Sequence, residues 1–148
     1  MLNYFMGTLS HNTVVAQGFS QMLKGGRFIW YYWTQKKLAQ WSEDDECFIF
    51  QGEIEAFRYL GKDATHKRVV KIFKAKPVWT IRDVVSGLDG YSKNQIWHPA
   101  STNLHFSSTS SPNRFKSYNS DYYGELTEEE SISFEFDASI STTLIYSP

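Results

Sequence analysis

Hydrophobic residues occur along the chain in short runs that are typical of β-strands. Runs rich in Val, Ile, Phe, Trp and Tyr recur roughly every ten residues, with Gly, Ser, Asn and Asp between them. Apolar and polar positions alternate with a period of two in Val78–Val85, and no window has the length and period of a stable helix. The pattern predicts an all-β fold, an antiparallel β-sandwich of two packed sheets. The strands we expect lie at residues 13–16, 27–33, 47–50, 53–60, 66–73, 78–85, 94–98, 103–106, 131–136 and 142–146.

The length, charge and cysteine content of the chain indicate one domain and argue against several classes of protein. Its 148 residues suit one domain spanning 1–148. Fifteen basic and sixteen acidic residues give a formal net charge of −1, which argues against a nucleic-acid binder and against a polybasic membrane module. The chain has no apolar run long enough for a transmembrane helix. One cysteine, Cys47, excludes an internal disulfide and a multi-cysteine zinc site, and it is expected to be a small core residue.

The aromatic content of 17% is high, and it is concentrated in Phe28–Trp33, where the sequence is FIWYYW. Large aromatic side chains are mostly buried, so we favour a central strand covered on both faces. The alternative is a surface on which sugar rings stack, with Trp30 as a candidate contact. The pattern alone leaves both interpretations open.

Polar residues offer few local motifs for chemistry. The spacing of His11, His66, His98 and His105 places no two of them together on one strand or helix face, so each is expected to be a structural or surface residue rather than a metal ligand. His66 and Arg68 should share a strand face, where they would hold a carboxylate-bearing polysaccharide or, slightly favoured, form a solvated edge.

Two acidic features have simpler interpretations than a binding site. Asp83 is interpreted as a turn residue at the end of its strand rather than a ligand. The acidic stretch Glu125–Glu130 is expected to be a solvated loop, because it lacks the spacing of a calcium-binding loop.

The segment Tyr4–Val15, with the sequence YFMGTLSHNTVV, carries the strongest similarity to a known family. It resembles the Gly-Thr-x-x-His-Asn-Thr-hydrophobic segment of the heparinase II/III-like polysaccharide lyases, a group that includes oligoalginate lyases. Weaker matches follow in the family's order along the chain, so that the resemblance covers nearly all of it. They are Gly61 with His66–Val70, Trp79–Gly87, Ile96–Pro99 and Ser120–Gly124.

The resemblance implies one part of a two-part enzyme. In this family a helical toroid supplies most catalytic residues, and a β-sandwich closes the cleft and carries a structural zinc site. The reaction is β-elimination at a uronic acid, in which a base removes the C5 proton and the glycosidic oxygen leaves C4. Family members are largely periplasmic, so we expect the parent protein to be periplasmic or secreted, although residues 1–6 do not resemble a signal peptide.

By the same resemblance, His11 matches one zinc ligand of the family. In the family, the other ligands come from His-x-His-x-Asp and Asp-x-Gly segments that precede this histidine. Neither segment occurs ahead of His11 in this sequence. We therefore expect a fragment that lacks the toroid and the first β-strands, with no catalytic residue and an empty zinc site. The substrate-binding candidates are His66, Arg68 and Trp30.

These observations leave three functional hypotheses. The first is the C-terminal β-sandwich of a heparinase II/III-like lyase that acts on an acidic polysaccharide, such as heparin, heparan sulfate or alginate, and is inactive alone. The second is a stand-alone carbohydrate-binding module for acidic glycans. The third is a structural sandwich that docks on the helical toroid of the same protein or forms a homodimer through an exposed sheet.

Overall fold

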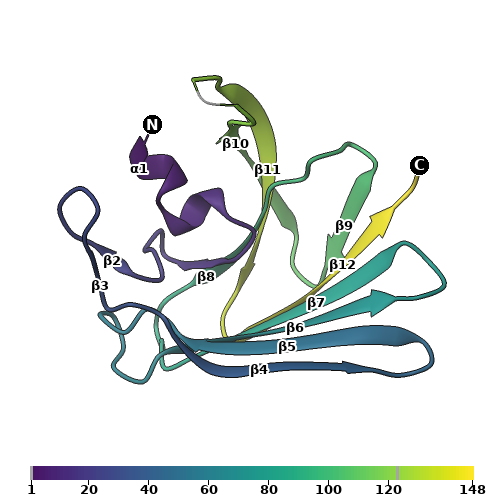
Figure 1. Ribbon diagram of the computed structural model, residues 1–148, viewed down its shortest axis with the longest axis horizontal. Helices are drawn as coiled ribbons and strands as arrows, with labels where there is room; N and C mark the ends of the chain where they lie inside the picture. The colour runs from purple at the N-terminus through teal and green to yellow at the C-terminus, as the bar shows by residue number, and fades with distance from the viewer. Residues whose placement is uncertain (1, 123) are drawn as a thin grey trace.

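The computed structural model describes residues 2–122 and 124–148, and strands account for most of them (Figure 1). Before the first strand come the short helix α1 (Leu2–Phe5) and the 3-10 turn η1 (Thr8–Ser10). Among the described residues no helix has the length and apolar composition to cross a membrane. The strands are β1 (Val14–Ala16), β2 (Leu23–Lys24), β3 (Trp30–Tyr31), β4 (Gln35–Glu43), β5 (Cys47–Glu55), β6 (Thr65–Phe73), β7 (Val78–Ser86), β8 (Lys93–Trp97), β9 (Leu104–Ser108), β10 (Pro112–Asn119), β11 (Thr127–Phe136) and β12 (Ser139–Tyr146).

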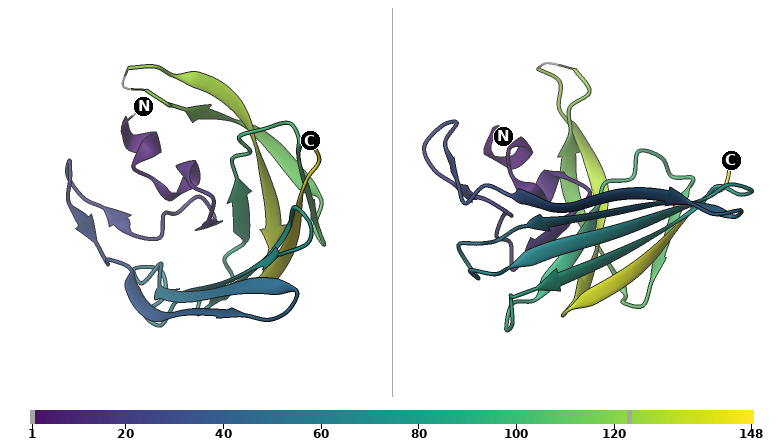
Figure 2. Two further views of the ribbon diagram at one scale, coloured as in Figure 1. Left: turned by 45° about the vertical axis from the view of Figure 1, so that its right-hand side comes forward. Right: turned by 60° about the horizontal axis from the view of Figure 1, so that its bottom comes forward.

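The strands form two large sheets and one small hairpin, all antiparallel. One sheet has the order β1-β8-β11-β10 and the other has the order β4-β5-β6-β7-β12-β9. In both views of Figure 2, β2 and β3 stand apart from these sheets, with α1 between them and the four-stranded sheet. We call residues 23–33 the β2–β3 arm. The expected antiparallel β-sandwich is confirmed.

The hydrophobic core lies where the two large sheets face each other. Alternation along each strand sends every second side chain inward, which buries apolar residues from both sheets. The six-stranded sheet contributes Ile81, Val85 and Ile140, and the four-stranded sheet contributes Trp97, Ile132, Phe134 and Phe136. Cys47 is buried and unpaired, as expected of a small apolar residue.

The six-stranded sheet is only partly covered on its inner face. One row of paired residues crosses it from Trp41 through Phe50 and Val70 to Ile81. Trp41 is 60% exposed and Phe50 is 38% exposed, whereas Ile81 is buried. Burial therefore falls off from β7 toward β4, and the inner face beside β4 is an open apolar surface.

The structure corrects the prediction for the aromatic segment. Phe28–Trp33 is not a central strand, since only Trp30 and Tyr31 pair, and they pair only with β2. Phe28 is 77% exposed and Trp33 is 61% exposed. The positive φ angles at Arg27 and Tyr32 bend the chain on either side of β3 and keep it out of both large sheets.

Three further elements differ from the sequence pattern. β4 and β10 were not expected, because both are edge strands whose polar side chains face solvent. Gly52, expected to separate two strands, lies inside the continuous strand β5.

Candidate functional site

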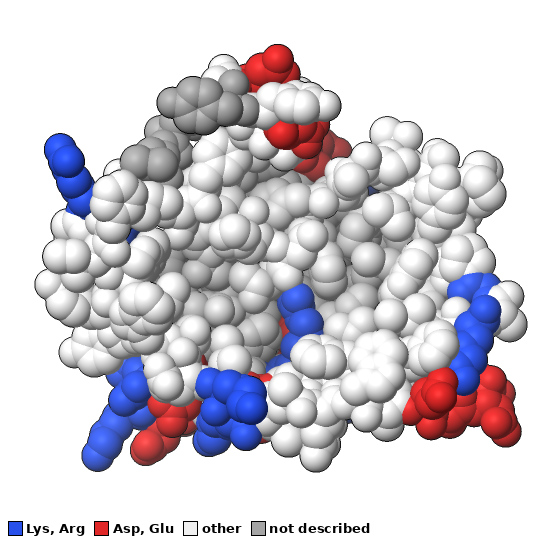
Figure 3. All heavy atoms as spheres, in the orientation of Figure 1, with Lys and Arg blue, Asp and Glu red and all other residues white. Residues whose placement is uncertain are grey.

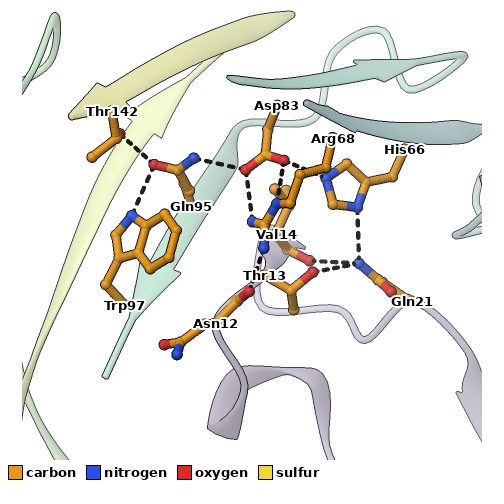
Figure 4. Close-up of polar contacts among 10 residues, drawn as sticks. All are labelled: Asn12, Thr13, Val14, Gln21, His66, Arg68, Asp83, Gln95, Trp97 and Thr142. Carbon is orange, nitrogen blue, oxygen red and sulfur yellow. Dashed lines mark hydrogen bonds and ion pairs between the residues drawn. The ribbon is translucent and has the colours of Figure 1, made fainter. Parts of the chain in front are cut away.

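A buried carboxylate, Asp83, lies at the centre of the polar cluster shown in Figure 4. Arg68 binds it with two donors, Nε at 2.7 Å from Oδ1 and Nη2 at 2.8 Å from Oδ2. His66 Nε2 lies 2.9 Å from Oδ1, and the Gln95 amide donates to Oδ2 at 2.7 Å. The charge of Asp83 is thus fully compensated inside the protein.

Strand register explains how the cluster forms. Arg68 on β6 is the direct cross-strand partner of Asp83 on β7, and His66 follows two residues away on the same face. Gln95 reaches the same carboxylate from β8 in the other sheet. Asp83 lies within β7, so its interpretation as a turn residue is wrong.

The electrostatics of the cluster keep Asp83 ionised. Burial alone would raise the pKa of its carboxyl group, because a buried charge loses its hydration. The hydrogen bonds from Arg68 and His66, together with the positive charge of Arg68, outweigh that effect and hold the pKa of Asp83 well below its usual range. Arg68 also lies over the Trp97 ring, with the guanidinium carbon 5.4 Å from the ring centroid.

The cluster also anchors the segment that contains the His-Asn-Thr motif. Arg68 Nη1 donates to the Asn12 carbonyl at 2.6 Å. The Gln21 amide donates to the Thr13 hydroxyl at 3.0 Å and lies 3.3 Å from His66 Nδ1. Because the ionised Asp83 only accepts, His66 donates from Nε2 and accepts from Gln21 at Nδ1. Both ring nitrogens of His66 are therefore occupied.

A second set of contacts, made by the half-buried His98, holds the same segment from the other side. His98 donates from Nε2 to the Leu9 carbonyl at 2.9 Å, and its Nδ1 accepts from the Ser131 hydroxyl at 2.6 Å. Its backbone N–H donates to the Asn12 side chain at 2.6 Å. Partial burial lowers the pKa of His98, despite opposing effects of the Leu9 carbonyl and the Glu129 charge.

The structure brings His11 and Trp30 together in a surface pocket of about 290 Å³. Thr13 and Gln21 also line it, so the pocket is separated from His66 by the Gln21 side chain. His11 itself is exposed. No group of three or more His, Cys, Asp or Glu residues within 2–122 and 124–148 is placed to hold a metal ion, so a complete zinc site does not fit these residues.

The predicted site residues thus fall into two groups. His66 and Arg68 do share a strand face, but they are engaged with Asp83, whereas His11 and Trp30 face the surface pocket. Sequence reasoning missed Asp83, Gln95 and Gln21. One signal was present for Asp83: a hairpin of residues 66–73 and 78–85 pairs position 68 with position 83. Tyr123, part of the Ser120–Gly124 match, lies outside the described residues.

Replacing Asp83 with Asn should destabilise the fold by about 3 kcal/mol, since it leaves Arg68 without its charged partner. Glu130→Gln is the matched control, because Glu130 forms an exposed ion pair with Arg114 and should cost less than about 1 kcal/mol. Urea unfolding near pH 7 measures the loss of unfolding free energy in both variants. Because the folded-state pKa of Asp83 is lowered, its contribution is complete above about pH 4 and is lost as the pH falls further. Equal effects of the two substitutions would contradict the assignment.

Acidification should also weaken the fold through His98. Its folded-state pKa is lowered, so the unfolded chain binds more protons, and the free energy of unfolding should fall as the pH drops below about 6.5. Protonated Nδ1 can no longer accept from Ser131. His98→Gln should reduce this pH dependence in urea unfolding between pH 8 and pH 5, whereas His105→Gln, at an exposed position, should not. An unchanged slope in His98→Gln would refute the idea.

Comparison with known structures shows the same fold in parts of two larger proteins. The "Heparinase III-BT4657 gene product" has a TM-score of 0.70 and 19% identity, over 97% of this chain and 25% of that one. A heparan sulfate lyase, HepC from Pedobacter heparinus, has a TM-score of 0.73 and 13% identity, over 99% of this chain and 25% of that one. The chain therefore spans about a quarter of the length of these proteins.

A search of curated proteins found no match. A family model described as "Heparinase II/III-like, C-terminal" matches residues 2–144, nearly the whole chain, and confirms the resemblance carried by the His-Asn-Thr segment. The chain belongs to the family of heparinase II/III-like C-terminal domains, and so to a family of polysaccharide lyases.

Proposed function

We propose that this β-sandwich supports the substrate cleft of a lyase that cleaves uronic-acid-containing polysaccharides by β-elimination, and that it is inactive alone. The observation that carries the proposal is the family match over residues 2–144, in a chain that covers 25% of each solved heparinase. The rest of the enzyme, including a helical toroid, would supply the catalytic residues. The proposed location is the periplasm or the cell exterior.

The geometry of His66 and His98 supports a scaffolding role. A general base needs a free nitrogen or oxygen within reach of the C5 proton. Both ring nitrogens of His66 and of His98 are already hydrogen-bonded within the protein. Tyr59 donates its hydroxyl to the Ser20 carbonyl, and burial raises its pKa, which opposes the ionised form that a tyrosine base requires.

The pocket beside His11 is the proposed contact with substrate in this part of the enzyme. Trp30 offers an apolar ring, and Thr13 and Gln21 offer polar groups, a combination that suits a sugar. His66 and Arg68 would act from behind the pocket by fixing Gln21 and the Asn12 carbonyl. Their direct contact with substrate stays a prediction.

Exposed aromatic residues favour a second candidate, a carbohydrate-binding module for acidic glycans. Phe28 and Trp33 are the kind of side chains on which sugar rings stack, and both are largely exposed. The open inner face at Trp41 and Phe50 is a separate surface, which we propose packs against the toroid or a second copy of the chain.

Zinc binding tests the metal part of the proposal. His11 would be one ligand of a zinc ion whose other ligands lie outside this chain. The isolated chain should then bind no zinc at micromolar concentration, since one imidazole is a weak site. Competition with a chromophoric chelator measures this, with His11→Ala and His105→Ala as comparisons. Stoichiometric zinc binding that is lost only in His11→Ala would show that this chain completes the site itself.

Activity of the isolated chain tests the central claim. Incubation with heparin, heparan sulfate or alginate should give no rise in ultraviolet absorbance, because no unsaturated uronate forms. Calorimetry should nevertheless detect binding of the acidic oligosaccharides at millimolar concentration or below. A rise in absorbance would overturn the proposed inactivity, and absence of any binding would overturn the role at the substrate cleft.

A further inference from the structure

Charge is unevenly distributed along this nearly neutral chain. Residues 1–42 contain four Lys or Arg residues and no Asp or Glu, while all sixteen acidic residues come after them. Figure 3 shows the outcome on one face. Acidic groups gather at the end of β10–β11, and acidic and basic groups are mixed at the end of β4–β5 and at the lower left, whereas the surface over β2 and β3 shows no acidic group and carries a basic one. The arm therefore presents a positive, acid-free surface, which favours an anionic partner.

Two cations of the arm are available to such a partner. Lys24 and Arg27 line a hollow of about 650 Å³ together with Asn3, Gly25 and Phe28. Lys24 contacts the neutral Asn3 side chain, and Arg27 is exposed. Within the described part of the chain, neither forms an ion pair with a carboxylate. Their charges are thus not neutralised by the protein itself.

One aromatic ring, that of Phe28, lines the hollow beside these cations, and other rings of the arm are held in place. Phe28 is the most exposed large hydrophobic residue of the described chain. The Trp33 indole donates to the Trp30 carbonyl at 2.7 Å, which fixes its orientation. Gly25 lets the Tyr31 ring pack against the turn, since a Cβ there would lie 2.6 Å from Tyr31 Cε2. The fixed rings of Trp33 and Tyr31 lose little entropy when the arm binds a ligand.

We infer that the β2–β3 arm is a binding site for the anionic groups of an acidic polysaccharide. Lys24 and Arg27 pair with its carboxylate or sulfate groups, and Phe28 packs against a sugar ring. The inference rests on the proposed function for the class of ligand, but the location and the residues come from the charge and geometry of the arm. This site is distinct from the pocket lined by His11.

Binding by the full chain tests the inference. The probes are a heparin hexasaccharide, which carries sulfate and carboxylate, a polyuronate hexasaccharide, which carries carboxylate only, and a neutral glucan hexasaccharide. Lys24→Ala combined with Arg27→Ala should weaken binding of an acidic probe at least about tenfold and flatten its dependence on salt. Phe28→Ala should weaken binding several-fold without changing the salt dependence. The two acidic probes show whether sulfate or carboxylate is preferred.

A matched control removes the same charge elsewhere. Lys71 and Lys76 are exposed on β6 and on the turn that follows it, so the double Ala variant should bind within about twofold of the wild type. Equal losses in the two double variants would reveal general charge attraction and overturn the inference, as would equal binding of the neutral probe. If the wild type binds but the arm variants bind as tightly, the inference alone fails. If the wild type binds no acidic glycan, the proposed function fails with it.

Discussion

The buried carboxylate of Asp83 is the constraint on which the arrangement of this domain depends. A charge in the interior must be compensated, and the partners of Asp83 come from two other strands: Arg68 and His66 from β6, and Gln95 from β8 across the sandwich. Such a cluster is a weak source of stability compared with apolar packing, but it is demanding in geometry. A shift of one residue between β6 and β7 would send Arg68 and Asp83 to opposite faces of the sheet. The cluster therefore specifies the register of β6 against β7, as well as the contact between the two sheets.

The same constraint reaches the surface through the N-terminal segment. That segment contains the short strand β1, but most of its residues lie outside the sheets, so side-chain contacts hold much of it. Arg68 holds the Asn12 carbonyl, Gln21 joins Thr13 to His66, and His98 holds Leu9 and Asn12. His11 lies between these anchors. The position of the exposed His11 imidazole thus depends on the Asp83 carboxylate, which it does not contact. This dependence explains why polar residues flank His11 in the His-Asn-Thr motif.

What the sequence predicts well is whatever depends on local pairing. The hairpin of β6 and β7 follows from alternation and a short connection, and it places position 68 opposite position 83. The contact of Gln95 with Asp83 was beyond such reasoning, because it depends on how two sheets stack. Whether a strand is covered by a second sheet also depends on residues far away in the sequence. Phe28–Trp33 has the composition of a central strand, yet nothing in those residues says whether another sheet will pack on them. β4 and β10 were missed for the opposite reason, since edge strands tolerate polar residues on both faces.

The high aromatic content has three different physical origins. Phe57, Phe134 and Trp97 fill the core. Trp41 and Phe50 lie on the open inner face of the six-stranded sheet, and this apolar surface suits packing against another protein domain. The rings of the arm differ from both sets, because they are interleaved with cations that no acidic residue of their own segment offsets. The net charge of −1 counts charged groups across the whole molecule, whereas a bound ligand responds mainly to charges within a Debye length of about 8 Å. The net charge therefore does not describe the surface that a ligand meets at the arm. The local balance of charge, rather than the total, separates a surface for an acidic glycan from one for another protein domain.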